Sequence, residues 1–242
     1  AGSGDSSIFI QMPSALSIPM NMEKYNWGFH SQPEPYLGGR RLHCPRGKVW
    51  GGSSSINGMV YVRGNAQDYD SWAANGADGW SYADVLPYFQ KAETSSRGKD
   101  SYRGNSGPLH TTMGRLKNPL YQAFMRAGEE AGYSRTEDPN GFQQEGFSQM
   151  HMTVDKGVRA STSQSYLSHA LSRKNLRVVT GAVASHLLME GDRAIGLKYQ
   201  KDGALFEIYT NREVILSAGA IGSPVILQRS GIGPPDTLGA AG

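Results

Sequence analysis

The chain lacks most of the features that would crosslink it, anchor it in a membrane or bind it to nucleic acid. Its 242 residues include one cysteine, Cys44, which excludes an intrachain disulfide and a cysteine-rich zinc site. A single free thiol favours a reducing compartment. No apolar run reaches about 18 residues, the length that a membrane-spanning helix needs. The net charge of +3 is spread thinly along the chain, so we expect no nucleic-acid partner.

Histidine is also scarce, and no pair of histidines has the spacing of a metal site. His186 alternates with strand residues, so we expect it at the surface or half-buried. His169 lies in a short helical run and is expected to face solvent. We predict no metal site and no catalytic residue among the six histidines, which are His30, His43, His110, His151, His169 and His186.

Local signals in the first half of the chain predict helices. Ser81, with Asp84 three residues later, forms the pattern of an N-terminal capping box. Pro87 lies inside the helix that follows and is expected to kink or split it. Asn118 is followed by a proline, which favours the first helical position, and Gly132 ends that helix. The expected helices cover 66–75, 82–93 and 119–131.

From residue 175 the hydrophobic period changes to that of strands. Residues 213–217 contain an uninterrupted apolar run, which predicts a strand covered on both faces. Small residues follow at 218–220, and Ser223 opens a helix that ends near Gly231. Together these features predict an α/β sheet edge that meets a phosphate-bearing ligand. The predicted strands are 176–180, 185–189, 194–200, 205–210 and 213–217.

The most informative segment is the glycine- and serine-rich loop of residues 46–64. Gly51 and Gly52 lack Cβ atoms, so the backbone can lie close to a flat or anionic ligand. The hydroxyls of Ser53–Ser55 can reach phosphate oxygens, and Asn57 can both donate and accept hydrogen bonds. The alternative interpretation is a tight connection that binds nothing.

Two long patterns resemble the signatures of the glucose–methanol–choline (GMC) flavin oxidoreductase family. The first starts at Gly47 and reads G-K-x-W-G-G-S-S-x-I-N-x-x-x-Y-x-x-G-x-x-x-x-x-D. The second starts at Gly219 and reads G-A-x-x-S-P-x-I-L-x-x-S-G-I-G. They occur in the family's order, and the resemblance covers essentially the whole chain. The stretches that are similar to the family's choline dehydrogenase branch are 25–27, 46–48, 88–93, 140–147, 157–162, 166–167 and 172–176.

The resemblance implies FAD as the cofactor, with the loop lying over its pyrophosphate and flavin ring. Ala184 stands where the family usually has a Val that contacts adenine through its backbone. For Met59 and Val60, plain packing is an equal alternative. Ile56 stands where some members carry a His that binds FAD covalently, so we expect non-covalent FAD. The residues predicted to contact FAD are Val49, Ser53, Asn57, Gly58, Met59, Val60 and Ala184.

The resemblance also implies a fold and an activity. The expected fold is α/β, with mixed α+β character: part of an FAD-binding Rossmann-like domain with an interposed segment of the substrate domain. The expected segments are 1–98 and 164–242 for the FAD-binding part and 99–163 for the start of the substrate-binding domain. The expected reaction passes a hydride from a primary alcohol, choline above all, to flavin N5. The electrons then pass to a quinone or an artificial acceptor.

The ends of the chain lead to further expectations. The chain starts without Met, has no G-x-G-x-x-G fingerprint and stops before the segment that carries the family's catalytic His, so we interpret both ends as truncations. A processed mature protein is the alternative. The chain alone is expected to be inactive and to bind flavin weakly or not at all.

Three rival functions stay open on the same residues: an aliphatic or polyether alcohol dehydrogenase, a lyase in which FAD stays redox-silent, and a non-catalytic family member. Peripheral membrane association of the full-length protein also stays open. So does its location, which is the cytoplasm or inner-membrane surface of a bacterium, or a mitochondrion.

Overall fold

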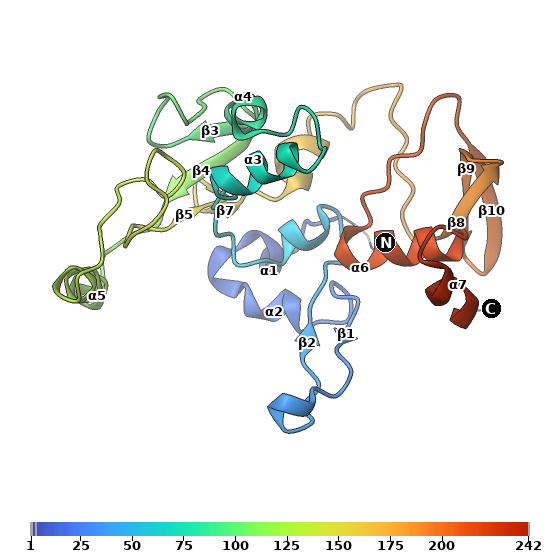
Figure 1. Cartoon of the computed structure of the whole chain (residues 1–242), viewed down its shortest axis with the longest axis horizontal. Coiled ribbons are helices and arrows are strands. Elements are labelled where there is room, and N and C mark those ends of the chain that lie inside the picture. Colours follow the sequence, from blue (N-terminus) through green and yellow to red (C-terminus); the bar gives the residue numbers. More distant parts are fainter. Residues whose placement is uncertain (1, 3, 242) are drawn as a thin grey trace. The chain divides into compact units, whose positions relative to one another are not determined.

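The computed structural model describes residue 2 and residues 4–241, which form two compact units (Figure 1). One unit comprises Gly4–Leu176, and the other comprises the chain from Arg177 onward. Both contain helices and strands, as expected of a mixed α/β chain.

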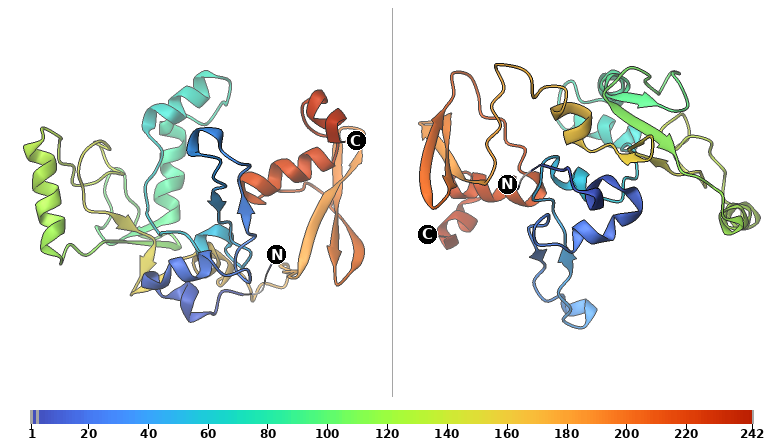
Figure 2. Two further views of the ribbon diagram at one scale, coloured as in Figure 1. Left: turned by 90° about the horizontal axis from the view of Figure 1, so that it is seen from below. Right: turned by 180° about the vertical axis from the view of Figure 1, so that it is seen from behind.

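The larger unit begins with short elements and a projecting hairpin. Its first helices have no more than four residues each: α1 (Ile8–Gln11), η1 (Pro13–Ala15) and α2 (Ser17–Met20). The strands β1 (Phe29–His30) and β2 (His43–Cys44) pair antiparallel, with η2 (Pro35–Leu37) between them. Figures 1 and 2 show this hairpin extending away from the rest of its unit.

Two helices start at the capping boxes that the sequence encodes. Helix α3 (Ala66–Ala74) is capped by Asn65, and helix α4 (Tyr82–Ala92) is capped by Ser81. Both predicted helices are therefore confirmed. Pro87 does not split α4, because the carbonyl that loses its partner belongs to Ala83, an exposed residue where water can take the missing bond.

Helix α4 leads directly into a small mixed sheet. Its strands β3 (Glu93–Ser95) and β4 (Leu109–Met113) are parallel, and β5 (His151–Met152) pairs antiparallel with β4. Helix α5 (Pro119–Glu130) has the predicted Asn118 cap and ends before Gly132, whose φ is 86°. The short strands β6 (Val154–Asp155) and β7 (Val158–Arg159) precede η4, a π-helical turn (Ser163–Leu167).

The interior of the larger unit has an apolar part and a polar part. Ile10, Tyr25, Val49 and Ile56 form a buried hydrophobic cluster next to the glycine- and serine-rich loop. Polar and charged side chains occupy the polar part, and the largest of those fully buried are Arg103, Arg159, His151 and Glu93. The loop thus contributes Val49 and Ile56 to the apolar cluster and also contacts the buried cation Arg159.

The second unit is an antiparallel meander with helices. Strands β8 (Ala182–Glu190), β9 (Arg193–Lys201) and β10 (Ala204–Tyr209) pair in the order β10-β9-β8. Asp202 and Gly203, with φ of 50° and 80°, form the two-residue turn between β9 and β10. Helix α6 (Gly219–Arg229) contacts β8, and α7 (Pro235–Ala241) follows. The three middle strand predictions are confirmed.

Two predicted strands do not form. Neither 176–180 nor 213–217 pairs with any described segment, and Ile215 is 78% exposed. An apolar strand needs neighbours on both sides to satisfy its backbone, and no described strand offers them. The prediction was therefore wrong for these residues in this structure.

The helix after residue 217 starts earlier than predicted. It begins at Gly219 instead of Ser223, and its N-cap is Ala218. The Ser223 hydroxyl, inside the helix, accepts a hydrogen bond from the backbone N–H of Ala218 at 3.0 Å, which satisfies one N–H at the helix start.

Candidate functional site

The backbone of the Gly/Ser loop, defined here as residues 46–60, bends at positions that favour glycine. Gly51 and Gly52 have φ of 81° and 55° and lead into the 3₁₀ turn η3 (Gly52–Ser55). A Cβ atom on Gly47 would lie 2.1 Å from the carbonyl oxygen of Gly52. The two arms of the loop thus approach too closely for any other residue at position 47.

A cavity of about 190 Å³ opens against this loop. Its lining combines one cation, one hydroxyl and one carboxamide with apolar groups. The Ser53 hydroxyl also accepts a hydrogen bond from the backbone N–H of Gly47 at 3.1 Å, which fixes its position. The lining residues are Met20, Pro45, Arg46, Ser53, Ile56 and Asn57.

The end of the loop presents free hydrogen-bond donors. Asn57 Nδ2 and the backbone N–H of Gly58 have no acceptor among the described residues. Val60 and Met152 form an isolated antiparallel bridge whose hydrogen bonds are made by flanking residues. The N–H of Val60 therefore points away from Met152. Three donors within four residues can serve a ligand rich in acceptors.

Some of the residues predicted to contact FAD are packing residues in this unit. The side chains of Val49 and Met59 are buried, and the backbone N–H of Met59 already donates to Asn57 Oδ1 at 3.0 Å. Val60 differs, because its side chain is 51% exposed. Ala184 belongs to the other unit, in β8, where it pairs with Tyr199. Of the predicted residues, Ser53 and Asn57 thus line the cavity, and Gly58 and Val60, which follow them in the loop, keep N–H groups without an acceptor among the described residues.

The serine hydroxyls do not all face a ligand. Ser54 Oγ donates to the carbonyl of Gly51 at 2.6 Å, and Ser55 Oγ donates to the carbonyl of Trp50 at 2.6 Å. These bonds satisfy backbone acceptors that the tight turn leaves open. Ser54 and Ser55 therefore donate within the loop, and the prediction of a phosphate donor remains for Ser53.

Sequence reasoning missed Arg159, which lies against the inner side of the loop. Its Nη1 donates to the carbonyl of Asn57 at 2.7 Å, to Asn57 Oδ1 at 2.9 Å and to the carbonyl of Ser54 at 3.3 Å. Its Nε donates to the carbonyl of Ile10 at 2.8 Å. The only sequence signal was its place in the stretch 157–162, which says nothing about these contacts.

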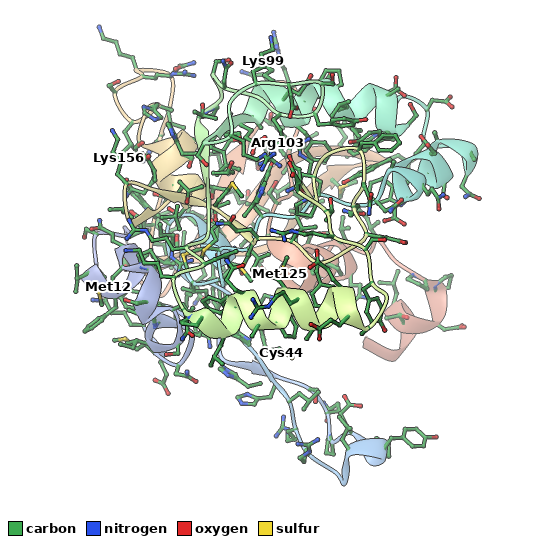
Figure 3. All side chains as sticks on the ribbon, turned by 90° about the vertical axis from the view of Figure 1, so that its left-hand side faces the viewer. Met12, Cys44, Lys99, Arg103, Met125 and Lys156 are labelled. Carbon is green, nitrogen blue, oxygen red and sulfur yellow. The ribbon has the colours of Figure 1, made fainter. Side chains whose placement is uncertain are left out.

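A second polar cluster holds the mixed sheet together. Glu93 accepts from Arg63 at 2.8 Å and pairs with Arg103 at 2.7 Å. Arg103, labelled in Figure 3, also donates to His151 Nδ1 at 3.0 Å and pairs with Asp138 at 3.4 Å. These residues connect α4, β3 and β5 through charges that are almost fully buried, and none of them lines the cavity.

Two groups at this cluster have shifted pKa values. Burial lowers the pKa of His151, and the Arg103 guanidinium lowers it further. Because a guanidinium only donates, His151 Nδ1 must accept, which leaves the proton of the neutral ring on Nε2. Burial raises the pKa of Tyr61 above its ordinary value, although the hydrogen bond from Arg63 opposes the shift. These groups are neutral at pH 7.

The exposed histidines behave as expected, since His169 is exposed and His186 is half-buried in β8. Within the part of the chain that the structure describes, no three His, Cys, Asp or Glu side chains are grouped as metal ligands would be. Among the described helices, none combines the length and apolar character that a membrane crossing needs.

Comparison with known proteins finds relatives that match over nearly the whole chain. The sequence profile of the family described as GMC oxidoreductase matches residues 7–241. The chain is 58% identical to an oxygen-dependent choline dehydrogenase of Photobacterium profundum, covering 100% of this chain and 43% of that protein. It is 52% identical to the mitochondrial choline dehydrogenase of Mus musculus, covering 95% of this chain and 38% of that protein. The chain thus spans less than half the length of these relatives.

Solved structures show the same backbone arrangement. The crystal structure of pyridoxine 4-oxidase from Mesorbium loti matches with a TM-score of 0.93 at 32% identity, covering 100% of this chain and 48% of that one. An FAD-dependent oxidoreductase from Chaetomium thermophilum matches with a TM-score of 0.91 at 32% identity, covering 99% and 44%.

Proposed function

The chain belongs to the GMC oxidoreductase family, and from this premise we propose that it forms the cofactor-binding part of an FAD-dependent dehydrogenase that oxidises choline. The observation that supports this proposal comes from the Gly/Ser loop. There, Ser53 and Asn57 line a cavity, and the N–H groups of Gly58 and Val60, a few residues along the loop, have no acceptor among the described residues.

The residues present suit FAD. The Arg46 side chain brings a positive charge to the cavity wall, and the Ser53 hydroxyl is a donor for a phosphate oxygen. The polar edge of a flavin ring offers carbonyl and nitrogen acceptors, which match the free donors of Asn57, Gly58 and Val60. The cavity volume of about 190 Å³ is smaller than an ordinary small-molecule site, so this loop supplies only part of the cofactor's contacts.

Bound FAD would supply the electron-pair acceptor for alcohol oxidation. The backbone N–H groups of Gly58 and Val60 would hold its polar edge and stabilise the negative charge that develops there on reduction. The apolar Met20 and Ile56 would keep water from the ring face. Since no cavity-lining residue is a histidine or a carboxylate, we propose that the proton acceptor comes from outside this set, on a segment after Gly242.

The side chain of Ile56 supports a proposal of non-covalent FAD binding. It is aliphatic and 2% exposed, packed with Ile10, Tyr25 and Val49. A hydrocarbon side chain has no atom that can bond covalently to the flavin, and for this reason we propose that FAD is held without a covalent link. Within the family fold, we place 1–98 and 164–242 in the FAD-binding domain and 99–163 in the substrate-binding domain, with Ala184 at the adenine end.

Choline is proposed as the substrate because the relatives at 52–58% identity are named as choline dehydrogenases. They come from bacteria and from mitochondria, so the protein is proposed to act in one of these settings. The electron acceptor is a quinone or an artificial dye. Oxygen is a further candidate, since the bacterial relatives are named oxygen-dependent.

The test is an anaerobic titration of a flavin-loaded protein that carries this chain at the length of its relatives. Choline is expected to bleach the visible flavin band, and the neutral tert-butyl analogue of choline to do so far more slowly. Bleaching by aliphatic or polyether alcohols but not by choline would overturn the substrate. Cyanohydrin cleavage without bleaching would favour a lyase, and a protein that takes up no flavin would overturn the proposal as a whole. Re-oxidation by quinone, dye or oxygen then identifies the acceptor.

A further inference from the structure

Arg159 is a buried cation without a carboxylate partner. Its side chain is 1% exposed, and no described carboxylate forms an ion pair with it. Arg63 and Arg103, in the same unit, are buried with Glu93 as a counter-ion. Among the buried arginines of the described residues, Arg63 and Arg103 thus have a carboxylate counter-ion and Arg159 has none.

The groups around Arg159 are dipoles. Its hydrogen bonds go to the carbonyls of Ile10, Ser54 and Asn57 and to the Asn57 carboxamide, and its Nη2 has no partner among the described residues. The acid on the neighbouring segment, Asp5, accepts hydrogen bonds from Ser161 and Gln164. Burial lowers the pKa of Arg159, but a guanidinium starts so high that it stays protonated at neutral pH.

Holding such a charge is expensive, so a compensating role is expected. Burying an isolated ion in a protein interior costs several kcal/mol. If the side chain at this position only had to fill space, an apolar residue could do so without this cost. The carbonyl dipoles offset part of this penalty. The remainder points to a ligand that bears negative charge near the loop.

Arg159 also controls the backbone of the loop. Asn57 Oδ1 accepts from Arg159 and, at 3.0 Å, from the backbone N–H of Met59. Met59 has φ of 61°, a left-handed conformation that is strained for a side chain of its kind. The guanidinium therefore secures the residue that keeps this turn in its strained shape. The open donors of Gly58 and Val60 lie on either side of Met59.

We propose that Arg159 is a positioning residue for the flavin: it fixes the Asn57–Met59 turn in the shape that binds the cofactor and places a net positive charge behind it. This inference rests on the proposed function. The turn is preorganised before the cofactor binds, which reduces the entropy lost on binding. The positive charge favours reduced flavin, which carries more negative charge than oxidised flavin.

Two substitutions separate shape from charge. Arg159→Met removes the charge and all the donors. Arg159→Lys keeps the charge but, with three donors on one nitrogen, cannot reproduce the bonds of the guanidinium to the four acceptor atoms of Ile10, Ser54 and Asn57. The exposed Arg173→Met serves as the surface control. In the cofactor-free protein, amide exchange of residues 51–60 is expected to accelerate in both Arg159 variants and to stay unchanged in β8 and β9.

Flavin binding and redox behaviour give the decisive results. The dissociation constant for FAD is expected to rise about 10- to 100-fold in Arg159→Met and less in Arg159→Lys. The midpoint potential of the bound flavin should become more negative in Arg159→Met and stay near the native value in Arg159→Lys. A residue with a purely structural role would not produce this difference between the two variants. Added guanidinium ion should partly restore flavin binding to Arg159→Met.

Unchanged FAD affinity or an unchanged midpoint potential in Arg159→Met would overturn the proposal. If that variant does not fold, the lysine variant decides: native affinity and native loop exchange in Arg159→Lys would overturn it, and weakened affinity would support it. All these measurements use a protein that carries this chain at the length of its relatives. If that native protein takes up no flavin, the proposed function fails, and loop exchange in the cofactor-free variants still decides whether Arg159 positions the turn.

Discussion

Glu93 and Arg103 form an ion pair of 2.7 Å in which neither side chain is exposed to solvent. Each oxygen of the carboxylate has a further partner, since Thr111 donates to Oε1 at 2.6 Å and Arg63 to Oε2 at 2.8 Å. Glu93 is also the residue at which helix α4 ends and strand β3 begins. The pair therefore joins secondary structure through charges that have no access to water.

Glu93→Gln is expected to destabilise the protein by about 3–5 kcal/mol, because it leaves the buried Arg63 guanidinium without a counter-ion and the buried Arg103 guanidinium with Asp138 alone. Chemical denaturation of both proteins measures the difference. The control is Glu129→Gln, which removes a surface pair with Arg135 at 3.8 Å and should change stability by less than about 1 kcal/mol. Equal effects of the two substitutions would show that burial does not decide the strength of these pairs.

Alanine substitution at two glycines of the loop is expected to lower protein stability at one position and leave it nearly unchanged at the other. Gly47→Ala places a methyl group 2.1 Å from the carbonyl oxygen of Gly52, so the backbone must move, and stability should fall by about 1–3 kcal/mol. Gly58→Ala meets no protein atom within 4 Å and should leave stability within about 0.5 kcal/mol of the native protein.

The same pair of variants tests flavin binding. Because the space beside Gly58 is open in the protein, a methyl group there should weaken FAD binding while the fold stays intact. Thermal unfolding of the cofactor-free protein and fluorescence titration with FAD give the two readouts. Native FAD affinity in Gly58→Ala would remove this residue from the predicted contacts.

The helices were predictable because their signals are local. The capping box at Ser81 and the asparagine–proline pair at Asn118 each lie within a few residues of the helix they open. The structure adds another signal of this kind, the capping box at Asn65. The turn at 202–203 is equally local, because aspartate–glycine favours the positive φ values that a tight hairpin needs. The sequence-based predictions therefore agree with the structure where residues close together in the sequence determine the local conformation.

The missed features depend on residues far apart in the chain. Arg159 is about a hundred positions from the loop it holds, and no periodicity predicts that contact. The run at 213–217 has the composition of a buried strand, yet a strand forms only when another strand pairs with it. The inward turn of Ser54 and Ser55 likewise depends on carbonyls that only the folded loop leaves open.

Protein stability should depend on pH through His151. Its pKa is lowered in the folded state by burial and by Arg103, so the unfolded chain takes up a proton first as the pH falls. The full stability is present above the unfolded pKa of about 6.5. Below it, stability declines by up to about 1.4 kcal/mol per pH unit, until the pH passes the folded pKa.

His151→Gln removes this titration and should flatten the decline between about pH 5.5 and 7.5, where carboxylates contribute little. His169→Gln is the matched control, because His169 is exposed and should leave the decline unchanged. Denaturation at several pH values gives both slopes. A native-like slope in His151→Gln would assign the pH dependence to another group.

Acid precipitation should release all the flavin from the protein into the supernatant. Ile56 stands where some family members carry the His that binds FAD covalently. Its side chain belongs to the buried cluster with Ile10, Tyr25 and Val49 and offers no reactive atom. Ile56→Val keeps this chemistry, should cost about 0.5–1.5 kcal/mol in stability, and should still release flavin quantitatively. Flavin absorbance in the washed pellet of the native protein would contradict the prediction. It would then direct attention to nucleophilic side chains outside the loop, because no hydrocarbon at position 56 could account for the bond.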